Sequence, residues 1–412
     1  MTNNTPNYGL GKILLASGVV IFAIGQSLLF IVVAPMARSI GFTEMEFGLA
    51  FSLANVSLIF AGPWWGKRSD VIGRKPVFII GLAGSAVGTL AMALTLGYGM
   101  NVTAAGGSAG LLVLAMVFGS RFIYGLTASG IYPSSSAYMA DITGWNDRAK
   151  GMALIGSANA LGSIIGPAIG GGLAFMGVLF PMYAAIGLSV LAAIAAAIWL
   201  VEPEQHKIRQ STPPSDKPPL KFTDARLVPY MIMWAAFFII FISLNFVTAF
   251  YIQDRFGITD LDDVMRTAGI MLACMAVVIT LVQGVLFQVI KISPQVLLVL
   301  AGPSFAIAVF TMGLAPNLVV LGIGFAILGG SFACATPGIN GCASLKMEAH
   351  EQGAAAGYLA AANTTGAILG PLVGSSLYQI QPNAPMLTGG ALMTVISIYA
   401  FTIPAPVQET PA

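Results

Sequence analysis

The chain has 412 residues, of which 57% are hydrophobic and 8% are charged, and its formal net charge is +2. A soluble globular protein carries about 25% charged residues, so this chain has too little polar surface to face water on all sides. It is therefore an integral membrane protein. The small net charge gives no reason to expect a nucleic-acid partner, and the three cysteines lack the paired spacing of a disulfide or metal site.

Apolar runs of about 18 to 25 residues recur along the chain, and each is long enough to cross a bilayer as a helix; we place about twelve of them. Their approximate centres are Ile24, Asn55, Val87, Arg121, Gly162, Val190, Phe241, Val277, Ser304, Ile327, Gly366 and Val395. A longer polar stretch with two Pro-Pro pairs separates the first six from the last six, as a flexible linker does. The sequence thus predicts an all-α membrane protein with six-helix bundles at 1–200 and 227–412, joined by a cytoplasmic linker at 201–226.

The basic residues predict the orientation of these spans. With an even number of spans and a cytoplasmic N-terminus, Arg38, Arg255 and Arg266 lie outside and Arg121 lies within a span, which leaves the other fourteen of the eighteen basic residues inside. Cytoplasmic loops are enriched in Lys and Arg, and the reverse orientation would invert this excess. We therefore expect both termini on the cytoplasmic side.

Two stretches of the chain, 147–173 and 351–377, resemble each other. A single offset superposes Gly162, Gly166, Pro167 and Gly170 on Gly366, Gly370, Pro371 and Gly374. A repeat at half the chain length predicts two copies of one bundle. Small residues at every fourth position let two helices approach closely in lipid, and each proline removes a backbone hydrogen bond. These stripes serve plain helix packing, and we expect them also to form a sliding surface between the half-bundles.

Between the second and third spans the chain reads GKRSDVIGRK, from Gly66 to Lys75. The two glycines permit tight turns, Asp70 can face a helix N-terminus or a cation, and Arg74 can pair with a carboxylate. The stretch resembles the G-x-x-x-D-x-x-G-R-K signature of the major facilitator superfamily; an ordinary basic cytoplasmic loop is the alternative. The resemblance implies the major facilitator fold, with two pseudo-symmetric six-helix bundles. It also implies an inner gate that contains Gly66, Asp70, Gly73, Arg74 and Lys75.

Three further matches extend this resemblance over nearly the whole chain. Arg121 with Gly125 resembles the R-x-x-x-G element of the fourth helix, with Tyr124 in place of the usual Gln. Asp141 and Arg148 resemble the acidic loop after that helix, and both join the predicted gate. The glycine-proline stretch of the fifth helix resembles the antiporter motif, which marks the 12-helix drug:proton antiporter group that includes the tetracycline exporters.

Arg121 is the only charged residue near the centre of a predicted span. A charge there costs at least about 3 kcal/mol, so it should face a cavity or a partner. We expect Arg121 to receive an anionic substrate group or to alternate with a proton; an arginine satisfied by helix carbonyls is the alternative. Gln26, Tyr124, Asn245 and Asp254 are the accompanying candidates for substrate binding or coupling.

One position departs from the family pattern. Tetracycline exporters carry an aspartate in the first helix, nine residues before a proline. Here Pro35 is that proline, and Gln26 occupies the matching position. A coupled proton would then use another carboxyl group, either Asp254 at the outer end of the seventh helix or Asp70 and Asp141 at the inner face. The alternative is that the substrate itself carries the titrating group.

The sequence therefore predicts a secondary active exporter of a small amphipathic or anionic molecule (a drug, antibiotic, siderophore or metabolite), working by proton antiport and alternating access without a bound cofactor. A proton-coupled or facilitative importer of a small metabolite is the rival function. An enzyme is not expected, because the G-x-S-x-G pattern at 106–110 lies in an outer loop without the strand or histidine of a hydrolase, and no Walker loop is present. We expect a monomer in a bacterial inner membrane, with the lipid bilayer and a small molecule as its partners.

Overall fold

The computed structural model describes residues 8–108, 110–143, 148–203, 220–290, 292–348 and 351–403. Within those ranges the chain is helical, with short connections and no strand. It divides into two compact units. Unit 1 comprises Met1–Gln210 and Ile258–Ile270, and unit 2 comprises Ser211–Gly257 and Met271–Ala412.

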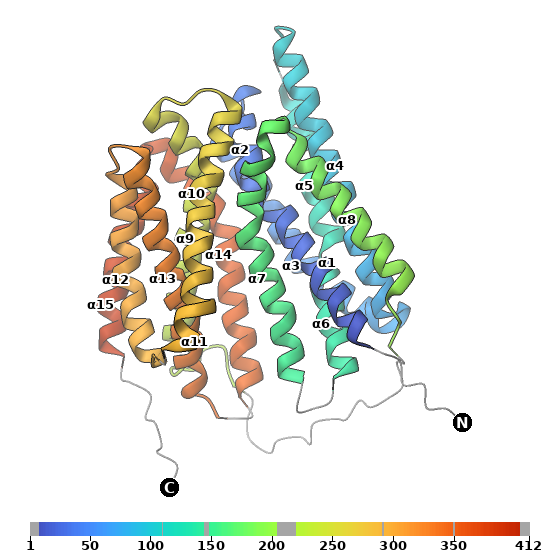
Figure 1. The fold of residues 1–412 in the computed structure, drawn as a ribbon, viewed down its shortest axis with the longest axis vertical. Coiled ribbons are helices and arrows are strands. Elements are labelled where there is room, and N and C mark those ends of the chain that lie inside the picture. Colours follow the sequence, from blue (N-terminus) through green and yellow to red (C-terminus); the bar gives the residue numbers. More distant parts are fainter. Residues whose placement is uncertain are drawn as a thin grey trace. The chain divides into compact units, whose positions relative to one another are not determined.

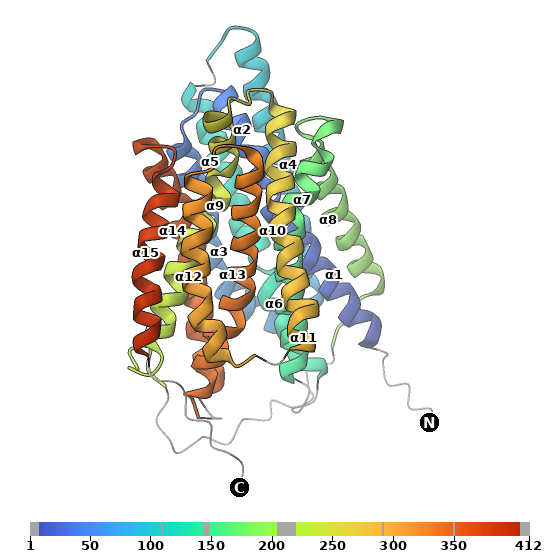
Figure 2. The same cartoon turned by 60° about the vertical axis from the view of Figure 1, so that its left-hand side comes forward.

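Eight α-helices and one short 3-10 turn form the N-terminal part of unit 1 (Figures 1 and 2). They are α1 (Tyr8–Ser27), α2 (Leu29–Ser39), α3 (Glu44–Ile72), α4 (Arg74–Ala104), α5 (Gly110–Ala128), α6 (Ile131–Ile142), α7 (Arg148–Leu173), η2 (Ala174–Met176) and α8 (Phe180–Trp199). The amide of Leu28 still bonds to the carbonyl of Ile24 at 3.0 Å, so α1 and α2 form one span. α5 and α6 likewise make up one span, Gly110–Ile142.

The remaining helices begin after the polar linker. They are α9 (Val228–Phe256), α10 (Leu261–Leu281), a π-helical turn (Val282–Leu286), α11 (Phe287–Val289), α12 (Pro294–Gly313), α13 (Leu318–Leu345), α14 (Gln352–Ile380) and α15 (Ala384–Thr402). In unit 2, α12 packs along α13 and α9 packs along α14 (Figures 1 and 2). Of the expected linker 201–226, only 201–203 and 220–226 are described.

Eleven helices of the described chain are long and apolar enough to cross a membrane. They match eleven of the twelve expected spans. The remaining one, centred at Gly366, corresponds to α14, a continuous helix of 29 residues. Its glycines, threonines and Asn363 make it less apolar than the other spans. The same small residues give it its close packing, described below.

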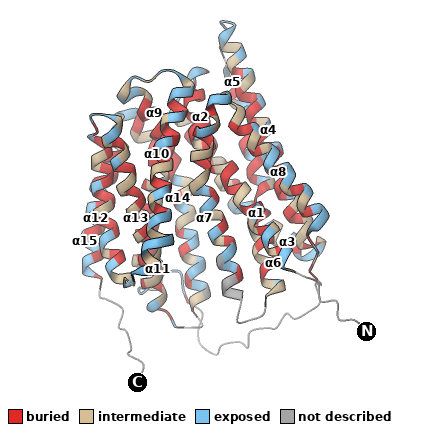
Figure 3. Ribbon diagram, viewed as in Figure 1, coloured by how far each residue is buried: buried red, intermediate tan, exposed pale blue. Residues whose placement is uncertain are grey.

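The helices bury one side and expose another, as Figure 3 shows. On α8 the buried residues recur every three or four positions, at Met182, Ala185, Ser189, Ala193 and Ala196. The exposed positions between them are large and apolar, for example Leu191 and Ile198. In a membrane protein such an apolar outer side faces lipid tails, so helix contacts depend on close packing rather than on escape from water.

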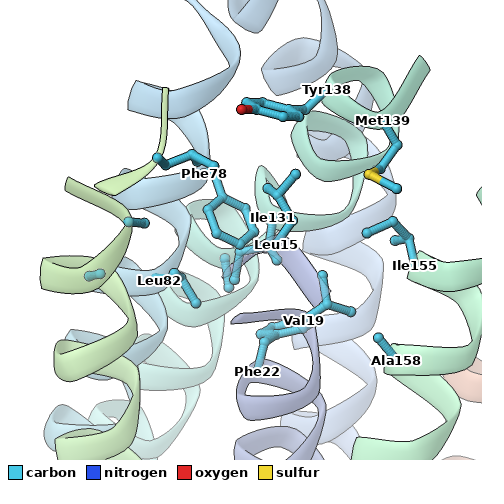
Figure 4. Packing of buried hydrophobic residues seen from close by; sticks show 14 of the residues in the cluster. Leu15, Val19, Phe22, Phe78, Leu82, Ile131, Tyr138, Met139, Ile155 and Ala158 are labelled. Atoms are coloured by element: carbon cyan, nitrogen blue, oxygen red, sulfur yellow. The ribbon is translucent and has the colours of Figure 1, made fainter. Parts of the chain in front are cut away.

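The core of unit 1 joins α1, α4, α6 and α7 (Figure 4). Leu15 and Val19 of α1 are fully buried beside Phe78 of α4 and Ile131 of α6. A Cβ on Gly18 would lie 3.1 Å from Cε1 of Phe78, so this glycine lets the phenylalanine ring press against the backbone of α1. This core fixes the neighbouring face of α1, which carries Phe22 and Gln26.

Candidate functional site

Arg121 lies on α5 inside unit 1 with only 2% of its surface exposed. Its Nε and Nη1 atoms are buried and have no hydrogen-bond partner among the described residues. The guanidinium carbon lies 4.7 Å from the ring centroid of Phe51 on α3 and 4.9 Å from that of Tyr124. Within the described chain, the positive charge is thus stabilised by aromatic faces and not by an acidic residue.

Two glycines allow this arrangement. A Cβ on Gly125 would lie 2.5 Å from the carbonyl oxygen of Ala54, so α5 touches the backbone of α3 one turn from Arg121. A Cβ on Gly88 would lie 2.7 Å from Cβ of Tyr124, so α4 presses on α5 from another side. Close contact on both sides holds Arg121 in the interior.

The first span completes this cluster. The ring of Phe22 on α1 stacks with that of Tyr124, with centroids 6.2 Å apart. One turn further along α1, the amide nitrogen of Gln26 donates to Oδ1 of Asn55 on α3 at 3.3 Å. The hydroxyl of Tyr124 is buried and has no hydrogen-bond partner in the ranges that the structure describes. The structure therefore brings three predicted residues, Gln26, Arg121 and Tyr124, into one region of unit 1.

The two candidates in unit 2 lie in different surroundings. Asn245 is buried, and its amide nitrogen donates to the carbonyl of Phe241 in its own helix at 2.7 Å. Asp254 lies near the end of α9, where Oδ2 accepts a hydrogen bond of 2.6 Å from the hydroxyl of Tyr378 on α14. Asn245 thus donates within its own helix, whereas Asp254 links two helices of unit 2.

Arg74 is the centre of the predicted gate. Its Nη2 pairs with Asp70 at 2.6 Å, and its Nε pairs with Asp141 at 3.0 Å. Its Nη1 donates to the hydroxyl of Ser69 at 2.6 Å. One guanidinium therefore ties the end of α3 to the start of α4 and the end of α6. Arg148 begins α7, but its side chain is outside the described part of the structure.

The sequence analysis missed Glu202, which lies after the end of α8. Its carboxylate accepts hydrogen bonds from the backbone amides of Arg74 at 2.6 Å and Lys75 at 2.8 Å. These amides are among the unpaired donors at the start of α4, where a negative charge is favourable. The contact joins residues more than 120 positions apart, so no local spacing indicates it.

The two glycines of the signature stretch differ from each other. Gly73 separates α3 from α4 with φ +103°, a conformation that favours glycine. Gly66 does not form a turn, and that expectation is wrong: α3 continues through it to Ile72. A Cβ there would only make an ordinary contact of 3.7 Å with Pro133.

Each glycine stripe packs against the first helix of its own unit. A Cβ on Gly162 would lie 2.7 Å from Cβ of Ala23, and one on Gly166 would lie 2.8 Å from the carbonyl of Ile24. In unit 2, a Cβ on Gly370 would lie 2.6 Å from Cβ of Ile242. The remaining stripe glycines make the same kind of contact: Gly170 with Leu28, Gly366 with Phe238 and Gly374 with Ser243.

A hydroxyl group crosses each of these interfaces. Ser27 donates to the carbonyl of Gly162 at 3.4 Å, and Ser243 donates to that of Gly370 at 2.7 Å. Pro167 and Pro371 lie inside the continuous helices α7 and α14. The expected sliding surface between the half-bundles is therefore wrong for these glycines, because they lie against α1 and α9 within a unit.

A second ion-pair cluster joins the starts of α9 and α14 in unit 2. Arg226 donates to both carboxylate oxygens of Glu351, at 2.6 and 3.1 Å, and to Oδ2 of Asp224 at 2.9 Å. The hydrogen bonds from Arg226 hold the pKa of Asp224 below its usual range. Asp224 and Glu351 in turn raise the pKa of Arg226.

Eleven helices of the described chain that are long and apolar enough to cross a bilayer, arranged in two compact units, define a multi-pass membrane protein. The sequence model of the Major Facilitator Superfamily matches residues 15–371. The chain belongs to this superfamily.

Among the relatives that cover most of the chain are two resistance proteins. The chain is 24% identical over 395 residues to "Multidrug resistance protein 2" of Bacillus subtilis (strain 168), covering 93% of this chain and 92% of that protein. It is 28% identical over 380 residues to "Tetracycline resistance protein, class G" of Vibrio anguillarum, covering 88% of each. Both names describe resistance proteins.

Solved transporters have the same fold at low identity. The human organic anion transporter MFSD10 (TETRAN) matches with a TM-score of 0.64 and 18% identity, covering 96% of this chain and 100% of that one. A mutant of the nucleoside transporter NupG matches with a TM-score of 0.69 and 15% identity, covering 95% of this chain and 98% of that one. These likenesses support the fold and leave the transported molecule open.

Proposed function

We propose that this chain is a secondary active exporter of a small amphipathic or anionic molecule, working by alternating access in a bacterial inner membrane. The observation that carries the proposal is Arg121, a buried guanidinium with two nitrogens unpartnered among the described residues and an aromatic surround. A membrane-buried charge without a counter-ion is costly, and an anionic group arriving from solution lowers that cost. The drug, antibiotic, siderophore and metabolite classes all contain molecules of this kind.

The direction of transport is inferred from sequence likeness. The glycine-proline motif of α7 resembles that of antiporters, and the relatives above carry the names of multidrug and tetracycline resistance proteins. Resistance of this kind is consistent with removal of a compound from the cell. The rival function is an importer of a small metabolite, which the shared fold accommodates equally well.

Protons are the coupling ions that we propose. Gln26 does not titrate, so the carboxyl group is sought elsewhere. Asp254 is the candidate, because its hydrogen bond from Tyr378 links α9 to α14 and its protonation would weaken that link. Asp70 and Asp141 serve the gate instead, since both bind Arg74. The chain is proposed to work as a monomer.

Transport by membrane vesicles tests this proposal. Inverted vesicles, whose interior corresponds to the outside of the cell, are given 2-naphthoate or tetracycline with and without an acidic interior. We expect accumulation that increases with the pH gradient, is abolished in Arg121→Ala and is reduced in Asp254→Asn. Uptake by right-side-out vesicles alone supports the importer, and uptake that ignores the gradient removes the proton from the mechanism. Gln26→Asp tests whether an acid in the first span strengthens the response to pH.

A further inference from the structure

Among the described residues, Arg121 is the buried charge that lacks a counter-ion. Among the residues that the structure describes, only Arg121 and Glu351 are both charged and buried, with exposures of 2% and 7%. Glu351 has its counter-ion, since Arg226 lies 2.6 Å away. Around Arg121 the described chain places aromatic rings and leaves two guanidinium nitrogens without a hydrogen-bond partner. The described part of unit 1 therefore holds one buried positive charge without a counter-ion.

We propose that unit 1 binds its substrate as a monoanion with a flat aromatic body, the carboxylate lying on Arg121. This inference rests on the transport function proposed above and names the chemical class that the site selects. One negative charge balances the guanidinium and removes the cost of its burial. A dianion such as a phosphate monoester is disfavoured because one of its negative charges would be buried without a partner. A cation is disfavoured because it would be repelled by the guanidinium.

The hydroxyl of Tyr124 strengthens the case for a carboxylate. It is buried, has no hydrogen-bond partner among the described residues, and belongs to the ring that lies 4.9 Å from the guanidinium carbon. A buried hydroxyl without a partner is unfavourable. A carboxylate has two oxygens and can accept from Arg121 through one and from Tyr124 through the other.

The flat body follows from the stacked rings around the charge. Phe22 stacks with Tyr124 at 6.2 Å and 14°, and Phe30 stacks with Phe51 at 5.4 Å and 25°. Both pairs include a ring that contacts the guanidinium of Arg121. Aromatic side chains in such pairs favour an added ring that stacks or meets them edge-on.

Gln26 and Asn55 are uncharged, so these two polar side chains add no negative charge to the site. They bond to each other at 3.3 Å and contribute polar groups without charge, on the turns next to Phe22 and Phe51. An acid at position 26 would supply a resident counter-ion to Arg121. Such an acid would compete with an anionic substrate and would favour cationic or zwitterionic molecules.

Binding of four matched probes to the purified full-length chain tests the inference. The probes share one ring system: 2-naphthoate, 2-naphthyl phosphate, 2-naphthylmethylammonium and 2-naphthylmethanol, measured by equilibrium dialysis at neutral pH. We expect 2-naphthoate to bind at least about tenfold more tightly than the other three, as a charge-assisted hydrogen bond allows. Arg121→Gln should lower the affinity for 2-naphthoate to that for 2-naphthylmethanol.

The two variants at position 26 form a matched pair. Gln26→Glu should weaken 2-naphthoate by about tenfold or more and strengthen the ammonium probe, because it introduces a charge. Gln26→Leu removes the same amide without adding a charge, so whatever affinity it loses should be lost for all four probes alike and their order should stay that of the wild type. Size-exclusion profiles and unfolding temperatures establish that each variant is folded. If Arg121→Gln fails to fold, the wild-type probe series and the pair at position 26 still decide the matter.

Three results overturn the inference: no binding of 2-naphthoate to the folded wild type, equal affinity for all four probes, or equal effects of the Glu and Leu variants. These failures differ from failure of the transport function. Charge-selective, Arg121-dependent binding without transport in vesicles rejects the transport function alone. Transport of tetracycline that ignores Arg121, together with unselective binding of the four probes, rejects this inference alone.

Discussion

At the scale of single residues, the carboxylate of Glu202 organises the turn between the second and third spans. It binds two backbone amides at the start of α4 and lies against Gly73, where a Cβ would be 2.9 Å from its carboxyl carbon. The helix N-terminus favours this negative charge, and the glycine leaves room for it. A residue with a side chain at position 73 would therefore suffer both backbone strain and a clash.

Gly73→Ala should lower the unfolding temperature more than Gly41→Ala does. Both glycines have positive φ, +103° and +85°, and a Cβ on Gly41 has open space around it. Gly41→Ala should thus lower the free energy of unfolding only by the cost of holding alanine at positive φ, about 1 to 2 kcal/mol. In a Glu202→Ala background the cost of Gly73→Ala should fall, because the clash with the carboxyl group is gone and only the backbone cost of φ +103° and ψ +158° remains. Equal losses at position 73 in both backgrounds would show that Glu202 does not cause the strain.

The Asp224–Arg226 pair predicts that the local stability of residues 220–227 decreases in acid. Because the folded pKa of Asp224 is lowered, its contribution to stability is present above the unfolded pKa and is lost as the pH falls through the folded pKa. The protection of the amides in 220–227, measured as exchange relative to the intrinsic rate at each pH, should therefore decrease below about pH 4 in the wild type. Asp224→Asn should show the lower protection already at neutral pH, with a smaller further change in acid. An unchanged exchange rate in this variant contradicts the role of the pair.

At the scale of helices, the small-residue stripes fix α7 onto α1 and α14 onto α9. Gly162→Ala should destabilise unit 1, because the new methyl group meets Cβ of Ala23 at 2.7 Å. Gly366→Ala should destabilise unit 2, because it meets the backbone carbon of Phe238 at 2.8 Å. Gly172→Ala, on α7 with nothing within 4 Å, is the control and should be neutral or slightly stabilising, by up to about 1 kcal/mol. Thermal unfolding in detergent measures all three, and an equal loss in the control would remove the packing argument.

The sequence predicts the spans well and their contacts poorly. Apolar length and the repeat between the two halves depend on local composition, so the helices and the buried position of Arg121 follow directly. Period-four glycines indicate that a helix has a close neighbour and do not identify it, so the sequence does not predict that Gly162 lies against α1 and Gly366 against α9. Glu202 and the partnership of Arg121 with Phe51 join distant segments, and no local pattern encodes them.

At the scale of the whole molecule, the two units share their backbone plan and differ in their charges. Serine hydroxyls cross equivalent interfaces in both, through Ser27 and Ser243. In the described ranges the uncompensated Arg121 lies in unit 1, whereas unit 2 pairs its buried Glu351 with Arg226. Of the two buried charges in the described ranges, only that of Arg121 is left to bind a substrate charge, so the charge of the transported molecule sets how much charge each transport cycle moves.

This charge predicts the voltage dependence of export. A monoanion leaving alone carries one charge, and one that leaves in exchange for an entering proton moves two charges in the same electrical sense. Each charge contributes about 2.3 kcal/mol per 100 mV, so a negative cell interior favours export in both cases. In proteoliposomes without a pH gradient, a tenfold gradient of 2-naphthoate should be balanced by about 59 mV for one charge and about 30 mV for two.

The membrane potential at which net flux is zero therefore gives the number of protons exchanged for each anion. Proton antiport, the coupling proposed for this chain, predicts the smaller value and a shift of about 30 mV for each unit of imposed pH gradient. The larger value with no such shift identifies export of the anion alone and removes Asp254 from the coupling. Net transport that ignores voltage means that the anion travels with a proton as a neutral pair. That outcome is incompatible with exchange of the anion for a proton, because the exchange moves two charges in each cycle.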